Sequence, residues 1–151
     1  SHPQAEFREG VKVWDIECDA AFPCATQNEI LKEDAETLLE NGCQLVCEGA
    51  NMPTHPDALR LFREAGILFG PGKAANAGGV AVSALEMQQN AGWETWPFAR
   101  VDKELKKIMT GIHSTCLHYA DRFGTPGDYV AGANIGGFLR VAQAMNAMGI
   151  T

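Results

Sequence analysis

Short apolar runs alternate three times with helix-like segments over the first 92 residues. The runs lie at residues 20–22, 43–47 and 67–70, and none has the regular polar alternation of a strand with one solvated face. The helix-like segments follow at residues 34–41, 54–65 and 78–91, with apolar positions three or four residues apart. Repeated strand-then-helix units are typical of a parallel sheet covered by helices on both faces. The pattern therefore predicts the α/β class.

Polar residues, Pro and Gly indicate where these helices begin and end. Thr26 followed three residues later by Glu29 is a capping-box pattern, which predicts a helix start after the first strand. Thr54 is the expected N-cap of the second helix, with Pro56 inside its first turn. Gly66 stands where that helix should stop.

After residue 92 the pattern changes to helices with no strand between them. An apolar stripe predicts a long helix over residues 101–123, and residues 124–128 form a turn. A last helix is expected around residues 135–145. We therefore divide the chain into residues 1–92, which carry the sheet, and residues 93–151, which form a helical tail.

Size and charge restrict the function classes. The chain has 151 residues, 46% of them hydrophobic, which is enough for one core. Its formal net charge is −7 and its 12 Lys and Arg are scattered, so we expect no nucleic-acid partner. No apolar run approaches the roughly 20 residues needed to span a bilayer, so we expect no membrane span. The abrupt polar start, Ser1 to Gln4, suggests a piece of a longer protein.

The number and spacing of the cysteines indicate the redox state of the thiols. The five cysteines are an odd set without a C-x-x-C spacing: Cys18, Cys24, Cys43, Cys47 and Cys116. This pattern favours reduced thiols in a cytoplasmic protein over a disulfide framework or a zinc site.

Three polar or Gly-rich segments follow the three predicted strands. They are "PCATQN", "EGANMPT" and "GPGKAANAGG". Ligands of open parallel sheets bind beyond the carboxyl ends of the strands, so we expect the three segments to line one crevice. Asn51 and Asn76 carry amides suited to a carboxamide or a ribose hydroxyl, although either Asn could equally serve local turn bonding. Ser83 could bond a carboxylate at the helix start, or bond back to a carbonyl of its own helix.

Other residues with reactive side chains favour structural roles. Lys73 could act as an acid or base, but an anion-contacting or solvated lysine is the preferred interpretation. Cys24 could have a lowered pKa before a helix, but a buried structural thiol is preferred. His113 and His118 are five residues apart on one helix and so lie on different faces. We therefore expect no metal site.

Residues 70–75 match G-x-G-x-x-A, a form of the dinucleotide fingerprint. Pro71 removes an N–H from the loop, and no further strand with an acidic residue follows. As a phosphate site the match is therefore weak.

The segments "DAAFPCATQNEI", "EGANMPT", "PGKAANAGGVAVSALEM" and "YVAGANIGGF" resemble the C-terminal portion of the hexameric glutamate dehydrogenases, from about Trp14 onward. The resemblance implies a partial Rossmann-like sheet of about three strands followed by two C-terminal helices. Residues 1–92 would be the C-terminal part of a dinucleotide-binding domain, and residues 93–151 its hinge helix and last helix. It also implies interconversion of L-glutamate with 2-oxoglutarate and ammonia by hydride transfer, in a homohexamer.

The resemblance also implies cofactor contacts. Ala25 and Thr26 would lie along the cofactor, and Asn51 near the nicotinamide ribose. Asn76 would bind the carboxamide. "EGANMP" and "PGKAANAGGVA" look closer to the NADP-using enzymes than to the NAD-using ones, so NADP is the favoured cofactor and NAD the alternative.

Ser83, with Val80 beside it, would reach the side-chain carboxylate of glutamate. The catalytic Lys and Asp and the true Gly-rich fingerprint of the family would lie upstream of Ser1, so we expect no catalytic residue in this chain and no activity from it alone. One alternative is a leucine, valine or phenylalanine dehydrogenase, which needs an apolar side-chain pocket. Another is a non-catalytic nucleotide-binding or assembly module.

Overall fold

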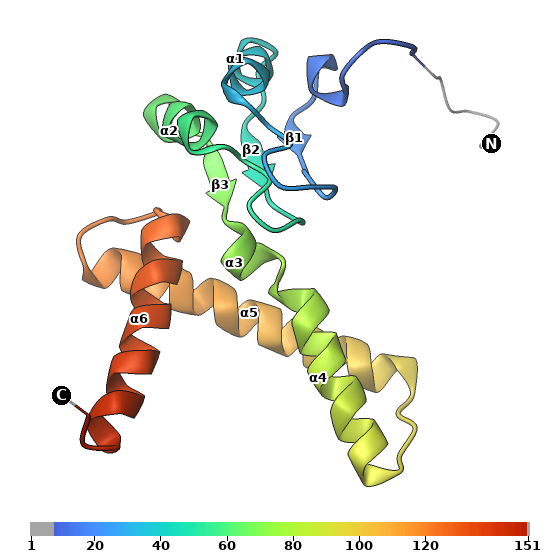
Figure 1. The fold of residues 1–151 in the computed structure, drawn as a ribbon, viewed down its shortest axis with the longest axis vertical. Coiled ribbons are helices and arrows are strands. Elements are labelled where there is room, and N and C mark those ends of the chain that lie inside the picture. The colour runs from blue at the N-terminus through green and yellow to red at the C-terminus, as the bar shows by residue number, and fades with distance from the viewer. Residues whose placement is uncertain (1–7, 151) are drawn as a thin grey trace.

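The computed structural model describes residues 8–150; Ser1 to Phe7, which include the polar start of the chain, and Thr151 lie outside them. The elements in chain order are the 3₁₀ turn η1 (Val13–Asp15), β1 (Ala20–Ala21), α1 (Lys32–Glu40), β2 (Leu45–Cys47), α2 (Pro56–Ala65), β3 (Leu68–Gly70), α3 (Gly72–Ala75), α4 (Ala77–Gly92), α5 (Phe98–Arg122) and α6 (Tyr129–Ala147). The sheet, α1 and α2 form one end of the molecule, and α4, α5 and α6 form the other (Figure 1).

The sheet is parallel, with the strand order β1-β2-β3. Ala21 pairs with Val46, and Val46 pairs with Phe69. Each strand passes to the next through a helix, and right-handed crossovers in one direction bring both helices to the same face. The predicted α/β class with a partial parallel sheet is confirmed.

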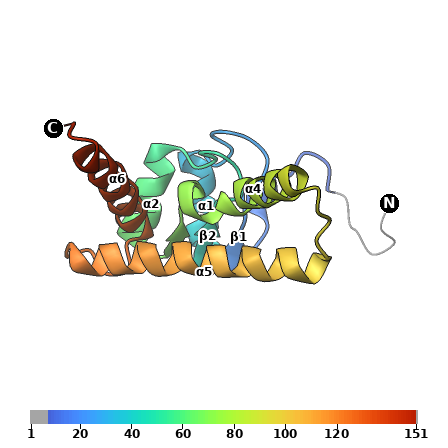
Figure 2. The same ribbon diagram turned by 90° about the horizontal axis from the view of Figure 1, so that it is seen from below.

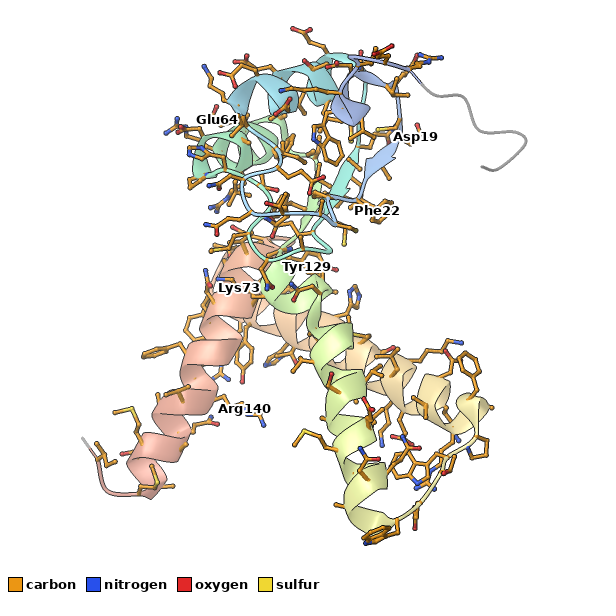
Figure 3. All side chains as sticks on the ribbon, turned by 45° about the vertical axis from the view of Figure 1, so that its right-hand side comes forward. Asp19, Phe22, Glu64, Lys73, Tyr129 and Arg140 are labelled. Carbon is orange, nitrogen blue, oxygen red and sulfur yellow. The ribbon has the colours of Figure 1, made fainter. Side chains whose placement is uncertain are left out.

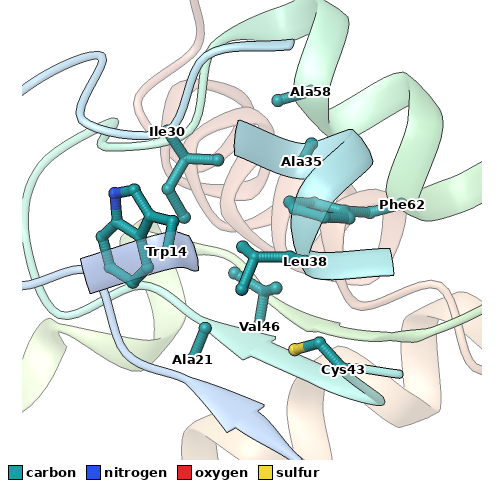
Figure 4. Packing of buried hydrophobic residues seen from close by; sticks show 9 residues of the cluster. All are labelled: Trp14, Ala21, Ile30, Ala35, Leu38, Cys43, Val46, Ala58 and Phe62. Carbon is teal, nitrogen blue, oxygen red and sulfur yellow. The ribbon is translucent and has the colours of Figure 1, made fainter. Parts of the chain in front are cut away.

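The core lies between this face of the sheet and α1 and α2. Leu38 of α1, Phe62 of α2 and Val46 of β2 are each 0% exposed, and their side chains converge in Figure 4. The ring of Phe62 stacks on Phe69 with centroids 6.2 Å apart. Burying one such side chain contributes roughly 1.5–3 kcal/mol. Trp14 of η1 closes the cluster beside β1.

The opposite face of the sheet has much less cover. Side chains alternate along a strand, so Leu68 points away from the face on which Phe69 packs, and Leu68 is 64% exposed. Cys47 and Gly70 line an apolar cavity of about 250 Å³ against α5. The expectation of a sheet covered on both faces is therefore wrong for the described residues, because α1 and α2 both pack on one side.

Two predicted helix starts are also wrong. Glu29 does accept hydrogen bonds from the N–H groups of Ala25 and Thr26, at 2.9 and 3.2 Å, but the helix begins only at Lys32. Instead, Gln27 and Asn28 form a turn, and Ile30 pairs with Thr54 in an isolated parallel bridge. For the same reason Thr54 is not the N-cap of α2.

The cap of α2 is His55, whose Nδ1 accepts from the N–H of Asp57 at 3.3 Å. Pro56 occupies the first turn and Gly66 ends the helix with a φ of 72°, as predicted.

The long helix predicted over residues 101–123 is α5, which lies across the lower part of the molecule (Figure 2). Helix α6 crosses it so closely that a Cβ at Gly132 would lie 2.0 Å from the carbonyl oxygen of Cys116. The turn before α6 contains Gly124 and Gly127, both at a φ of 80°. Helix α3 was not predicted, because residues 70–79 read as a loop.

Candidate functional site

The three segments after the strands line one cleft of about 690 Å³. Residues 24–27 come from the segment after β1, residues 49–51 from the segment after β2, and Asn76 and Val80 from the start of α4. The expectation of a shared crevice at the carboxyl end of the sheet is confirmed. Five of the six predicted site residues line it: Ala25, Thr26, Asn51, Asn76 and Val80.

Asn51 and Asn76 form a hydrogen-bonded amide pair in this cleft. Asn76 Nδ2 donates to Asn51 Oδ1 at 2.7 Å and to the carbonyl oxygen of Ala50 at 3.1 Å. Within the described part of the chain, Asn76 Oδ1 and Asn51 Nδ2 make no hydrogen bond. The pair therefore offers the cleft one acceptor and one donor group.

A buried carboxylate lies behind the pair. Glu48 follows β2 directly and is 8% exposed. Its Oε2 accepts from the N–H of Gly72 at 2.6 Å, and its Oε1 accepts from the N–H of Thr54 at 3.2 Å. Sequence reasoning missed Glu48, although an acidic residue directly after a buried strand is an unusual position that could have drawn notice.

The G-x-G-x-x-A match has a structural explanation. The N–H of Gly72 is already bonded to Glu48, and a Cβ at this position would lie 2.9 Å from the carbonyl oxygen of Ala50. Gly72 thus allows close packing between the short helix α3 and the segment after β2. This use of Gly72 agrees with the weak prospect of a phosphate site.

Ser83 differs from the other predicted residues. It is exposed, lies one turn beyond Val80, and does not line the cleft. Its hydroxyl donates to the carbonyl oxygen of Gly79 at 3.2 Å, which is the back-bonding alternative open from the sequence. Val80 is 71% exposed, so the start of α4 presents both side chains to solvent.

Lys73 and Cys24 also have defined places. The ammonium group of Lys73 donates to Asn134 Oδ1 and so links α3 to α6 at the junction that Figure 3 labels with Lys73 and Tyr129. Cys24 is exposed and lines the cleft, so the preferred interpretation of a buried thiol is wrong. No helix begins within seven residues after it: the chain forms a turn at Gln27 and Asn28, and α1 starts only at Lys32.

The two histidines of α5 contact different partners. His113 Nδ1 lies 3.0 Å from the hydroxyl of Tyr129, and the ring of His118 packs edge-on against Tyr119. Residues 8–150 contain no group of three or more His, Cys, Asp or Glu side chains arranged to hold a metal ion. In the same range, no helix is long and apolar enough to cross a lipid bilayer.

Residues 1–149 match the family described as Glutamate/Leucine/Phenylalanine/Valine dehydrogenase. The glutamate dehydrogenase of Bacteroides thetaiotaomicron is 51% identical over 145 residues, covering 96% of this chain and 33% of that protein. The NADP-specific glutamate dehydrogenase of Salmonella typhimurium is 52% identical over 145 residues, covering 95% of this chain and 32% of that protein.

Solved structures agree with the sequence comparison. The crystal structure of Plasmodium falciparum glutamate dehydrogenase superposes with a TM-score of 0.86 and 48% identity, over 89% of this chain and 29% of that one. The chain therefore spans about a third of the length of the curated relatives that it matches.

Proposed function

The chain belongs to the glutamate/leucine/phenylalanine/valine dehydrogenase family, and we propose that it forms the C-terminal part of the cofactor domain of a glutamate dehydrogenase. The whole enzyme would interconvert L-glutamate with 2-oxoglutarate and ammonia. NADP, when bound, supplies the hydride acceptor. The glutamate dehydrogenases among the relatives and the free amide groups of the cleft support this assignment.

The observation that carries the proposal is the amide pair. Asn76 Nδ2 is used within the protein, so Asn76 would face a carboxamide with its oxygen and accept from the carboxamide NH₂. Asn51 Nδ2 would donate to the nicotinamide ribose. Ala25 and Thr26, which line the same cleft, would lie along the cofactor. These contacts would fix which face of the nicotinamide ring is turned to the substrate and would exclude water from that face.

Ser83, with Val80 beside it, would reach the side-chain carboxylate of glutamate. The hydroxyl proton of Ser83 now points to Gly79, and a bound carboxylate would have to draw it away, because a hydroxyl has only one donor hydrogen. A hydrogen bond to a charged acceptor is the stronger one, so the exchange is favourable. The acid–base residues of the reaction would belong to sequence outside these 151 residues, and the chain alone would be inactive.

The choice of NADP over NAD is supported by the relatives named NADP-specific. We also propose that residues 1–92 and 93–151 correspond to the sheet-bearing and the helical parts of one domain. The whole enzyme would be a cytoplasmic homohexamer that has no nucleic-acid or membrane partner.

The experiment is a substrate and cofactor panel on the intact protein that contains this chain. We expect NADP reduction with glutamate, little with leucine, valine or phenylalanine, and slower reduction with NAD. Ser83→Ala should lower kcat/KM for glutamate by roughly tenfold, because a hydrogen bond to a charged group is lost.

A preference for leucine, valine or phenylalanine would overturn the glutamate assignment in favour of the sister activities of the family. Cofactor binding without turnover of any amino acid would favour a non-catalytic module. Turnover by the 151-residue chain alone would contradict its proposed inactivity.

A further inference from the structure

Glu48 is the first residue of the segment that carries Asn51, and it bonds the first residue of α3, the helix that leads to Asn76. It is buried, and both its carboxylate oxygens accept hydrogen bonds from backbone N–H groups. Among residues 8–150 it takes part in no ion pair. A buried carboxylate without a cation is costly unless its lone pairs are satisfied. Two backbone bonds, one within its own segment and one to α3, are thus the defined role of this side chain.

The bond to Thr54 closes the loop of residues 48–54 that carries Asn51, and the bond to Gly72 joins this loop to α3. Thr54 lies at the far end of this loop, and Gly72 is the first residue of α3. Helix α3 ends next to Asn76, whose amide donates back to Ala50 and Asn51. The loop and α3 are therefore tied together at both ends of α3, by Glu48 at one end and by the amide of Asn76 at the other.

The packing around Glu48 leaves little room for adjustment. A Cβ at Gly72 would lie 3.2 Å from Glu48 Oε2 and 2.9 Å from the carbonyl oxygen of Ala50. A displacement at Glu48 would consequently move α3 relative to Ala50, and with it the donor and acceptor positions of the amide pair.

We propose that Glu48 is a positioning residue for the nicotinamide end of the cofactor: it holds Asn51 and Asn76 at the spacing that binds the carboxamide and ribose. The proposal rests on the proposed function. Glu48 lies outside the lining of the cleft itself and acts through the two asparagines.

The test is Glu48→Gln in the intact protein. The amide keeps the shape of the side chain but turns one acceptor into an NH₂ group that meets a backbone N–H, so one of the two ties is lost. We expect the Kd for NADPH to rise about tenfold. The Kd for 2′,5′-ADP, a ligand without the nicotinamide end, should stay unchanged.

Asp34→Asn is the matched control. Asp34 is also a buried carboxylate, 3% exposed, and it does not line the cleft. It accepts from the N–H of Leu31 at 2.9 Å and from Lys12 Nζ at 2.7 Å. This variant should lower the denaturation midpoint in urea without changing the Kd for NADPH. It separates loss of a buried carboxylate from loss of the cleft geometry.

The outcomes are distinct. An unchanged NADPH Kd in Glu48→Gln, or equal weakening of NADPH and 2′,5′-ADP, would overturn the positioning role while leaving the proposed function intact. Failure of the unsubstituted protein to bind NADPH would overturn the proposed function and this inference together. Selective weakening of NADPH in Glu48→Gln, absent from Asp34→Asn, is the supporting result.

Discussion

At the scale of single residues, Cys24 is a thiol whose reactivity reports on the cleft. It is exposed and lines the cleft, whereas Cys116 is buried between α5 and α6. Burial raises the pKa of the Cys116 thiol above its ordinary value, so at a given pH less of it is the reactive thiolate. Iodoacetamide should therefore alkylate Cys24 well before Cys116.

We predict that NADPH slows this alkylation of Cys24 in the intact protein, because a bound cofactor would cover the cleft wall formed by residues 24–27. Mass spectrometry of the alkylated peptides over time measures it. Cys18, which does not line this cleft, is the internal control. Equal rates at Cys24 with and without saturating NADPH would contradict cofactor binding in this cleft.

Some residues of the site could be predicted from the sequence, and others could not. Asn51 and Asn76 were found because amides after parallel strands are chemically suggestive, and the strand order brought them to one cleft. Which amide groups remain free could not be predicted, since it depends on a contact between residues 25 positions apart. Glu48 carried one local signal, its position directly after a buried strand, but its bond to Gly72, 24 positions away, is set by tertiary packing.

At the scale of elements, the crossing of α5 and α6 depends on Gly132. It is buried, and a Cβ there would overlap the backbone of Cys116, 2.0 Å from its oxygen and 2.7 Å from its carbonyl carbon. We predict that Gly132→Ala forces the helices apart and lowers the unfolding free energy by about 2 kcal/mol or more. Hydrogen exchange of the α6 amides and the melting temperature would measure this loss.

Gly137 provides the control on the same helix, because a Cβ there would meet no atom within 4 Å. Gly137→Ala should raise stability by up to about 1 kcal/mol, since Ala has the higher helix propensity. If both substitutions stabilise α6 alike, the close crossing is not a constraint.

Element prediction succeeded where periodicity was long. The stripe over residues 101–123 identified α5, observed at Phe98–Arg122, to within three residues at either end. It failed where local signals have two meanings. Thr26 and Glu29 form the backbone bond of a capping box without a helix, and Gly–Pro–Gly at residues 70–72 leads into the four-residue helix α3 instead of a loop.

At the scale of the whole molecule, the chain exposes apolar surface on several elements. Leu68 of β3 is 64% exposed and Phe22, at the β1 edge of the sheet, is 58% exposed (Figure 3). On α6, Phe138 and Val141 are 69% and 60% exposed, and Met145 continues the same helix face at 41%. An open strand edge and apolar patches of this kind favour association.

We therefore predict that the 151-residue chain, prepared alone, self-associates. Its weight-average mass in sedimentation velocity should rise with concentration, because each added contact removes Phe138, Val141 or the open sheet face from water. The double variant Phe138→Gln with Val141→Gln should shift association to higher concentration if the α6 stripe contributes. Arg140→Gln, between them on the same helix, is the matched control and should leave the profile unchanged. A monodisperse monomer that melts cooperatively would contradict the prediction and would mean that α1, α2 and the one covered sheet face suffice for an independent fold.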